Sequence, residues 1–577
     1  MRAYSSRLAS RLLTRSAPFA ALALLAAACG LTFEGLDTPA ALPDATADAP
    51  VPADASRDTA TADATPADAG DAGDAGDAGD AGDAGDAGDA GDAGDATVVP
   101  SWEFDWTAIV GTGQSLSVGS QGLPVLSTVP SFNNLKLDDT GPDPRFSDAT
   151  NLALVPLSEP IRPYPFPASY TAGVYPANIR GETPHTAMAS QITTLARARG
   201  MLDLATLHSV VGSGGKAMSF IAKGGTGNSY ERTLYEGAAF KTFATTAAKR
   251  LGYGAVILTH GEADAIVTSY EASLITLATN YDADLRAITG QARAVPMFVS
   301  QQHSIPRRGE PTLRSASTLA AWTASRVAPG KVVCLGPKYQ YSYVSDRVHF
   351  DAFSYRRLGI KHGQAFFQHS VLGKPWKPLE PTSVTRTGRV LRVAFHVPTP
   401  PLVWDAALPT PHPEAGNPWG PGKGFEAEDS NGPLAIESVA IVGDAVDITL
   451  TDPPTGTDLV VRYAMTQDTT GPNGARAGEA DGRMGLLRDS DPFVGIDDEE
   501  LTVSAVAGSP TLTGDFSRHG RYELVTGAGL TGERALIARS ATSATLSGPW
   551  AGVTGVVKVR VHSNQHNYSV AFELPVP

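Results

Sequence analysis

The chain contains one long stretch that lacks the apolar residues needed for a folded core. Residues 31–99 are mainly Ala, Asp, Pro, Thr and Gly, and a strict Asp-Ala-Gly triplet runs from Asp68 to Asp95. Few side chains here can offset the entropy that is lost on ordering, and the regularly spaced aspartates repel one another. A collagen helix is excluded, because the triplet contains no proline and repeats an aspartate at every turn. We therefore expect residues 30–100 to form a disordered acidic linker.

This linker also accounts for the acidity of the chain. The 577 residues include 60 Asp or Glu and 45 Lys or Arg, which gives a formal net charge of −15. Residues 31–100 hold 17 of the acidic residues and one basic residue, Arg57. The rest of the chain is therefore nearly neutral and gives no sign of the basic face that nucleic-acid binding requires. We expect no nucleic-acid partner.

The first 29 residues have the pattern of a bacterial export signal. Four arginines within the first fifteen residues precede an apolar run from Phe19 to Ala28, which is too short to span a bilayer comfortably. The run ends in Leu-Ala-Ala-Ala before Cys29, which resembles the lipobox of bacterial lipoproteins. This resemblance implies cleavage before Cys29, its acylation, and a membrane-anchored protein that faces the periplasm or cell surface. The alternative is a simple secretory signal that happens to contain a cysteine.

Beyond Trp102 the sequence alternates between short β-rich runs and helical periods, which is typical of an α/β domain with a parallel sheet. The predicted strands are Thr107 to Val110, Leu204 to Val211, Ala255 to Thr259, Met297 to Gln301 and Val332 to Leu335. Apolar residues at helical spacing predict helices across Met188 to Leu195, Leu234 to Leu251, Leu274 to Ile288 and Ala352 to Phe367. Residues 120–184 are expected to form long loops, and Cys334 to lie buried in a strand.

Near Gly373 the pattern changes, and three closely spaced prolines indicate a domain boundary. Afterwards apolar and polar residues alternate, as in residues 391–397, and Gly443-Asp444 separates two such runs as a hairpin turn would. We therefore expect an α/β domain at residues 101–375 and a β-rich domain at residues 376–577. The second domain would be a β-sandwich or a pair of β-subdomains. Its role would be either to bind glycan or to brace the first domain, and bracing is favoured because no aromatic platform is evident.

Two segments contain the residue types of a serine nucleophile and its base. Ser115 follows the first predicted strand in the run Gly-Thr-Gly-Gln-Ser, and open α/β sheets place reactive groups at the carboxyl ends of their strands. Asp346 precedes His349 by three residues, so its carboxylate can accept the Nδ1 proton and turn Nε2 toward a serine hydroxyl. Asp351 comes next and is interpreted as the cap of the following helix.

Polar residues also follow the second and third predicted strands. The run Gly212-Ser213-Gly214-Gly215-Lys216 lacks the spacing of a phosphate-binding loop, and its backbone N–H groups would suit an oxyanion hole. The run His260-Gly261-Glu262-Ala263-Asp264 comes directly after the third predicted strand, where polar residues are often functional.

Taken in order, the four segments resemble the four sequence blocks of SGNH/GDSL hydrolases. They are most similar to the branch of carbohydrate esterases that contains sialic-acid-specific acetylesterases and acetylxylan esterases. The resemblance covers about residues 105–370 and implies a three-layer, doubly wound, flavodoxin-like sheet, followed here by the β-sandwich-like domain. It implies that Ser115 is the nucleophile, His349 the general base and Asp346 the carboxylate that orients the base.

The same resemblance assigns supporting roles. Gly215 or Gly214 would join the Ser115 N–H in the oxyanion hole, and Glu262 matches an acid that supports the site. His260 stands where this branch usually has glutamine, so a neutral imidazole would have to replace that side-chain donor. Whether Asp346 or Glu262 is the main acid of the triad stays open.

The expected reaction is a two-step acyl transfer that requires no metal and no organic cofactor. The resemblance implies an O-acetylated carbohydrate as substrate, either sialic acid or a polysaccharide. One alternative is a hydrolase of other small esters or lipids on the same fold. A second alternative is a surface glycan-binding protein that has lost catalytic activity.

Overall fold

The computed structural model describes residues 102–139, 152–161, 181–303, 316–406, 408–412, 415–465, 485–493 and 495–577. All of these belong to one compact unit, Val99–Pro577. The expected export signal with Cys29, and the expected linker at residues 30–100, lie outside the described residues.

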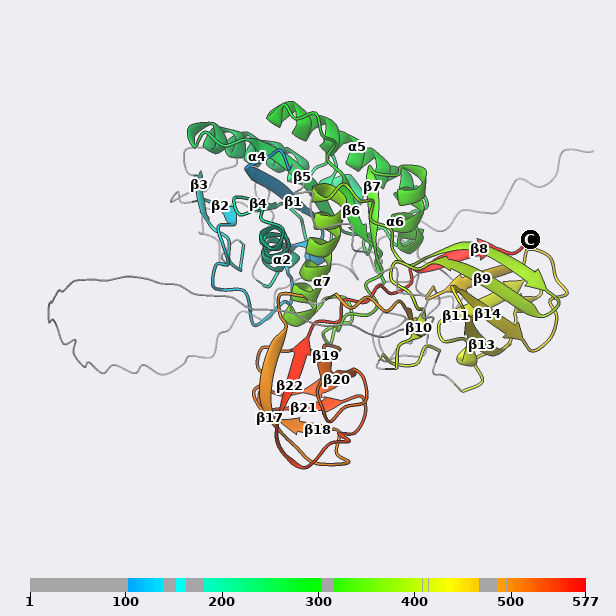
Figure 1. The fold of residues 1–577 in the computed structure, drawn as a ribbon. Coiled ribbons are helices and arrows are strands. Elements are labelled where there is room, and N and C mark those ends of the chain that lie inside the picture. Colours follow the sequence, from blue (N-terminus) through cyan, green and yellow to red (C-terminus); the bar gives the residue numbers. More distant parts are fainter. Residues whose placement is uncertain are drawn as a thin grey trace, which may run out of the picture. The chain divides into compact units, whose positions relative to one another are not determined.

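A seven-stranded sheet forms the centre of the N-terminal part (Figure 1). Its strands are β1 (Trp106–Gly113), β2 (Leu135–Asp139), β3 (Leu152–Pro156), β4 (Ala205–Val210), β5 (Leu251–Thr259), β6 (Met297–Ser300) and β7 (Val332–Gly336). They lie in the order β3-β2-β4-β1-β5-β6-β7, and only the β2–β3 pair is antiparallel. The chain places β4 on one side of β1 and β5 to β7 on the other. A crevice is therefore expected where the order reverses, at the carboxyl ends of β1 and β5.

Helices cover both faces of this sheet. They are α2 (Pro184–Ala198), α3 (Met218–Ile221), α4 (Ser229–Thr246), α5 (Tyr270–Thr289), α6 (Ala316–Val327) and α7 (Ala352–Phe366), with the short η1 (Ser115–Val118) and the π-helical η3 (Phe367–Val371). Alternate strand residues enter different cores, because successive side chains of a strand point to opposite faces. Ile109 packs with residues of α2 and α7, whereas Val110 packs with residues of α4, α5 and α6. The expected α/β class with a parallel sheet is confirmed.

All five predicted strands form, and Cys334 is buried in β7, where burial raises the pKa of its thiol to about 12. Gly290 ends α5 in the left-handed conformation. Two expectations were wrong. Leu251, assigned to a helix, begins β5. The first residues of this strand were missed because Gly252 and Gly254 interrupt its apolar pattern. The region expected to be all loops contains the hairpin β2–β3, whose first strand alternates leucine with charged residues.

Two four-stranded antiparallel sheets follow the α/β part, in the orders β13-β14-β9-β8 and β12-β11-β15-β23. Their strands are β8 (Glu380–Thr387), β9 (Val390–His396), β11 (Phe425–Asp429), β12 (Gly432–Pro433), β13 (Ile436–Val442), β14 (Ala445–Leu450), β15 (Val460–Tyr463) and β23 (Phe572–Pro575). Phe395 of β9 contacts Phe425 of β11 and Phe572 of β23 edge to face, with ring centroids 6.5 and 6.1 Å apart. The two sheets therefore share one core, as in a sandwich. The predicted turn at Gly443 joins β13 to β14.

A closed barrel is inserted between the strands of the sandwich. Its strands are β17 (Glu499–Ala505), β18 (Thr511–Thr513), β19 (Leu524–Thr526), β20 (Arg534–Arg539), β21 (Ser543–Leu546) and β22 (Gly555–His562). The small pair β10 (Val403–Trp404) and β16 (Leu487–Arg488) and the turn η4 (Gly420–Gly422) precede it in the chain. The chain then leaves the barrel and adds β23 to the sandwich. The β-rich part thus contains a sandwich and, inserted in it, a barrel. The sequence had predicted either a β-sandwich or a pair of β-subdomains, and the structure has features of both.

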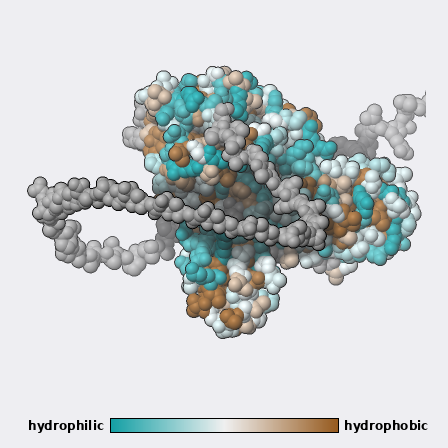
Figure 2. All heavy atoms as spheres, viewed as in Figure 1, coloured by the Kyte–Doolittle hydropathy of each residue, from teal (hydrophilic) through white to brown (hydrophobic). Residues whose placement is uncertain are grey.

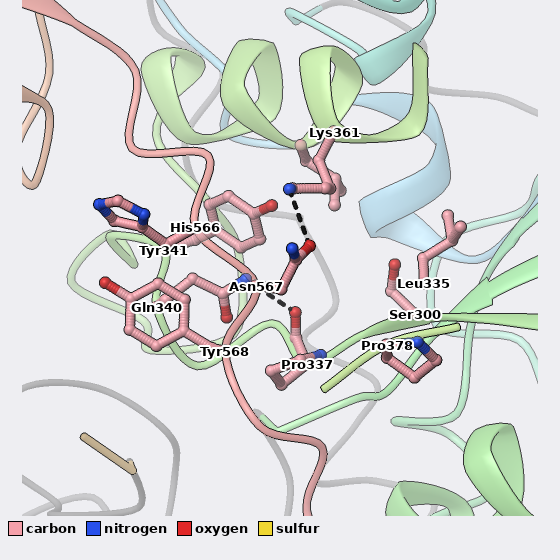
Figure 3. Close-up of a pocket in the computed structure, with 11 residues that line it drawn as sticks. Ser300, Leu335, Pro337, Gln340, Tyr341, Lys361, Pro378, His566, Asn567 and Tyr568 are labelled. Atoms are coloured by element: carbon pink, nitrogen blue, oxygen red, sulfur yellow. Dashed lines mark hydrogen bonds between the residues drawn. The ribbon is translucent and has the colours of Figure 1, made fainter. Parts of the chain in front are cut away.

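The stretch between β22 and β23 lies against the α/β part. Lys361 of α7 donates a hydrogen bond to the Gln565 carbonyl. It donates a second, at 3.1 Å, to Asn567 Oδ1 (Figure 3). Burial lowers the pKa of Lys361 to about 8. Gln301, just after β6, exchanges two hydrogen bonds of 2.8 Å with the Ala571 backbone. These contacts fit the expected bracing role of the C-terminal residues.

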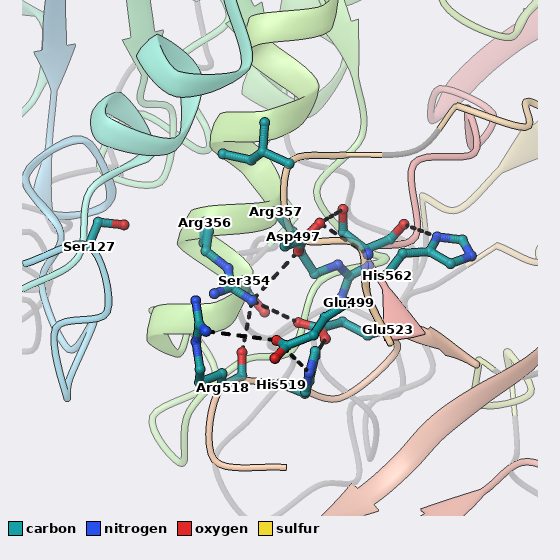
Figure 4. Close-up of polar contacts among 12 residues, drawn as sticks. Ser127, Ser354, Arg356, Arg357, Asp497, Glu499, Arg518, His519, Glu523 and His562 are labelled. Carbon is teal, nitrogen blue, oxygen red and sulfur yellow. Dashed lines mark hydrogen bonds and ion pairs between the residues drawn. The ribbon is translucent and has the colours of Figure 1, made fainter. Parts of the chain in front are cut away.

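Charged side chains join the barrel to the first turns of α7. Arg356 lies 3.6 Å from both Asp497 and Glu523, and the His519 ring lies 2.7 Å from Glu523 (Figure 4). Burial raises the pKa of Asp497. Burial would also raise the pKa of Glu523, but the hydrogen bond from His519 and the charge of Arg356 lower it. Because α7 begins three residues after His349, this bracing acts close to the candidate base.

The surface mixes polar and apolar residues. Figure 2 shows hydrophilic and hydrophobic residues interspersed over the described part of one face. Within the described ranges, no helix is both long and apolar enough to cross a membrane.

Candidate active site

Ser115 lies at the carboxyl end of the central strand β1. Gly113 ends the strand with φ of +130°, and a Cβ there would lie 2.1 Å from the Thr259 carbonyl oxygen of β5. The Gln114 N–H donates to that same oxygen at 3.1 Å. Only glycine permits this close approach, so the chain can turn at once into η1, whose first residue is Ser115. The serine is thereby placed half-buried at the β1/β5 reversal point.

The structure brings Ser115, His349 and Asp346 together. His349 Nε2 lies 2.7 Å from Ser115 Oγ, and His349 Nδ1 lies 2.7 Å from Asp346 Oδ2. A carboxylate can only accept, so Nδ1 carries a proton and Nε2 is available to take the serine proton. Serine and histidine are 234 residues apart in the chain, and only the fold places them within reach.

Asp346 is held by its own loop. Its Oδ1 accepts the Val348 N–H at 2.8 Å and the His349 N–H at 2.9 Å. Arg347 between them adopts the left-handed conformation with φ of 56°, which lets the chain wrap around the carboxylate. Burial would raise the pKa of Asp346, but the hydrogen bonds from His349 and Val348 outweigh it and lower the pKa. The carboxylate therefore stays ionised opposite the imidazole.

Glu262 contacts a lysine instead of the histidine. Its Oε1 accepts from Lys338 Nζ at 3.0 Å, and the side chains are 1% and 0% exposed. Burial would raise the pKa of Glu262, but the Lys338 ammonium lowers it. Lys338 was missed from the sequence, although it follows a predicted strand by three residues, as Glu262 does. Asp351, predicted to be a cap, accepts the Ser354 N–H at 2.7 Å at the start of α7.

The glycine loop after β4 runs beside the serine turn. The Ser213 N–H donates to the Gly113 carbonyl at 2.9 Å, and a Cβ on Gly212 would lie 1.9 Å from Ser117 Oγ. Gly214 and Gly215 follow, the latter with φ of +66°. Across the described chain, the backbone N–H groups of these two glycines donate to no acceptor. Both N–H groups therefore have no partner within the described residues, and their expected role in an oxyanion hole stays a prediction.

His260 is fully engaged away from the serine. Its Nε2 lies 2.9 Å from the Lys216 carbonyl, its Nδ1 lies 2.8 Å from the Tyr270 hydroxyl, and the residue is 1% exposed. Both ring nitrogens are thus occupied. The expectation that a neutral imidazole replaces the missing oxyanion donor is corrected by this geometry, which instead connects the ring to the glycine loop.

No family model matches this chain, and no curated protein does. Among solved structures, a carbohydrate acetylesterase from Xanthomonas citri is similar at 14% identity, covering 67% of this chain and 81% of that chain, with a TM-score of 0.42. A protein from Arabidopsis thaliana is similar at 17% identity over 46% of this chain and 99% of its own, with a TM-score of 0.34. NanS is similar at 12% identity over 46% of this chain and 97% of its own, with a TM-score of 0.31. Likenesses this distant assign no family.

Proposed function

We propose that this chain is a serine esterase that removes O-acetyl groups from carbohydrates. One observation carries the proposal: two 2.7 Å contacts connect Asp346 to His349 and His349 to Ser115, which follows the carboxyl end of β1. A capped helix start or a glycine-rich turn would explain the residues singly, but neither would align all three atoms for proton transfer.

In the proposed reaction, His349 Nε2 takes the Ser115 hydroxyl proton while Oγ forms a bond to the ester carbonyl carbon. The resulting oxyanion is met by the N–H groups of Ser115 and of Gly214 or Gly215. The imidazolium then returns its proton to the departing sugar oxygen as the carbon–oxygen bond of the ester breaks. Water, deprotonated by the same imidazole, attacks the acetyl-serine, releases acetate and restores the hydroxyl. Asp346 stays ionised and stabilises the imidazolium.

We also propose that residues 101–375 form an SGNH/GDSL-type domain. With the β2–β3 hairpin set aside, the order β4-β1-β5-β6-β7 corresponds to the flavodoxin-like order, and helices on both faces fit a three-layer domain. The choice of an acetylated carbohydrate, sialic acid or polysaccharide, comes from the likeness of the motifs. Export and acylation at Cys29 would place the enzyme on the periplasmic or outer surface of a membrane, tethered by residues 30–100.

The test measures acetate release from a panel of acetylated sialic acids and polysaccharides by the wild type and by Ser115→Ala. Acetate release that depends on Ser115 is expected, together with a strong preference for aryl acetate over aryl butyrate. A butyrate preference would indicate a general ester or lipid hydrolase. No labelling of the wild type by a fluorophosphonate would contradict the proposed serine chemistry and favour an inactive glycan-binding protein.

A further inference from the structure

The glycine loop is anchored on both sides of its two central glycines. On one side the Ser213 N–H donates to the Gly113 carbonyl at 2.9 Å. On the other side the Lys216 carbonyl lies 2.9 Å from His260 Nε2. Two residues later, the Met218 N–H donates to Asp264 Oδ2 at 2.6 Å. His260 and Asp264 belong to the same short run after β5, so one segment fixes the far side of the loop.

The two glycines between these anchors are spanned only by one long turn hydrogen bond within the described residues, from the Lys216 N–H to the Ser213 carbonyl at 3.4 Å. Glycine populates both signs of φ readily, so a Gly-Gly pair is the most mobile dipeptide that a loop can contain. Gly215 has φ of +66°, and the space around its Cβ position is empty within 4 Å. In the described part of the chain, neither glycine N–H finds an acceptor. The direction of both N–H groups therefore depends on the anchors at Ser213 and Lys216.

The His260 ring is itself held in one tautomer. A carbonyl oxygen only accepts, so Nε2 must carry the proton that is donated to Lys216. Nδ1 then accepts from the Tyr270 hydroxyl at 2.8 Å, and the two rings are nearly parallel, at 15°. Burial lowers the pKa of His260, which favours the neutral ring that this pattern needs. Tyr270 begins α5, so the imidazole is fixed by a helix and a strand end together.

We propose that His260 is a positioning residue. Its hydrogen bond to the Lys216 carbonyl fixes the loop so that the Gly214 and Gly215 N–H groups point toward the oxyanion. This inference rests on the proposed function and deepens it. Its physical basis is that oxyanion donors stabilise the transition state only if they are oriented before the reaction begins. His260 touches no reacting atom, and its contribution reaches the substrate through the loop.

The first test compares His260→Leu, which cannot donate, with His260→Gln, which can. Losing one oriented oxyanion donor lowers kcat by about 10²–10³-fold in serine hydrolases, so His260→Leu is expected to lower kcat for an aryl acetate by about 100-fold. The KM should change much less, because the ground-state carbonyl uses these donors weakly. His260→Gln should recover most of the loss, since its amide N–H can reach the same carbonyl.

Tyr270→Phe keeps the ring and removes only the hydroxyl that fixes the tautomer, and it is the variant to use if His260→Leu does not fold. We expect kcat to fall by roughly 3–10-fold, since the loop keeps its partner but the imidazole can flip. Tyr253→Phe is the matched control. Its buried hydroxyl, on β5 of the same domain, makes no hydrogen bond within the described residues, so its removal should leave kcat unchanged.

The second test needs no catalysis and is done in the Ser115→Ala background. Amide hydrogen exchange of residues 212–218 should be faster in His260→Leu and Tyr270→Phe than in Ser115→Ala alone. If kcat falls while exchange is unchanged, His260 acts on the oxyanion directly and the proposal is overturned. If kcat is unchanged, it is also overturned. A wild type without esterase activity would refute the proposed function, whereas the exchange result would still decide whether His260 holds the loop.

Discussion

Asp346 and Glu262 are two carboxylates of one candidate site in opposite environments. Asp346 is 36% exposed at its side chain, and its partners lie within three residues in the chain. Glu262 is 1% exposed, and its partner Lys338 is 76 residues away. The half-exposed group can respond to a charge that appears and disappears on His349. The charge of the buried group is already balanced by Lys338, so we expect Glu262 to hold two loops together.

The sharpest test of this contrast is catalytic. Asp346→Asn should lower kcat by up to about 10⁴-fold, because an amide favours the wrong imidazole tautomer, and Ser115→Ala or His349→Ala should cost at least as much. The measurement is kcat/KM for an aryl acetate. Asp351→Asn, which removes a carboxylate only two residues beyond His349 but keeps an oxygen that can cap α7, is the control and should stay within a few-fold. Near-normal activity of Asp346→Asn with an inactive, folded Glu262→Gln would reverse the two roles.

Loss of the buried Glu262–Lys338 ion pair should lower the stability of the protein. Removing one partner of a buried ion pair leaves an uncompensated charge, so Lys338→Met and Glu262→Gln should each lower the free energy of unfolding by about 3–5 kcal/mol. The double variant should recover part of this loss, because no lone charge stays buried. Urea unfolding of the three variants and of Asp346→Asn gives the comparison. Equal losses for Asp346→Asn and Lys338→Met would contradict the assignment of Glu262 to a structural role.

Two other buried groups, His362 and Glu159, should have opposite effects on the free energy of unfolding as the pH changes. Burial lowers the pKa of His362 to about 3, so its contribution to stability is complete above about pH 6.5 and is lost as the pH falls from 6.5 toward 3. Burial and the nearby Glu182 raise the pKa of Glu159 to about 8, so its contribution is complete below about pH 4.5 and is lost as the pH rises toward 8.

When the pH falls from 7.5 to 5.5, the free energy of unfolding of His362→Gln should therefore rise by about 1 kcal/mol relative to that of the wild type. That of Glu159→Gln should fall by at least as much relative to the wild type. Urea unfolding at the two pH values measures both differences. Shifts of the same sign would show that one of the two groups is not buried as described.

The smallest expected effect concerns the backbone of the catalytic loop. Arg347 has φ of 56°, which costs a residue with a side chain about 1–2 kcal/mol and glycine much less. Arg347→Gly should leave stability within about 1 kcal/mol, because the relieved strain offsets the greater freedom of the unfolded chain. Arg347→Val should lower both the melting temperature and kcat, since a branched side chain resists this conformation. Equal behaviour of the two variants would mean that the turn tolerates another backbone path.

The sequence was most informative where partners are close in the chain or follow a recognisable strand. The spacing of Asp346 and His349 is a local property, and the position of Ser115 follows from the end of a clearly apolar strand. The pairing of Glu262 with Lys338 depends on two different loops meeting, which no local pattern records. His260 was noticed, but its direction could not be predicted, because Tyr270 and Lys216 are brought to it only by folding.

The fold divides in the same way. Five buried parallel strands are visible as apolar runs, whereas the short strands β2 and β3 were taken for loop. The period-two pattern after residue 376 indicated β-structure, yet closure of β17 to β22 into a barrel depends on which strands pair. That pairing is a long-range property, since the barrel's first strand bonds to its last.

The insertion of the barrel into the sandwich bears on how the protein is made. Strand β23 pairs with β15, which is synthesised more than a hundred residues earlier. The preceding residue, Ala571, bonds to Gln301 at the end of β6. During synthesis the barrel can form as a unit, but the sandwich and its contact with the α/β part can be completed only once β23 has emerged. Residues 99–577 should therefore gain their full shape only when β23 is added, and a nascent chain stopped before β23 should not yet have it.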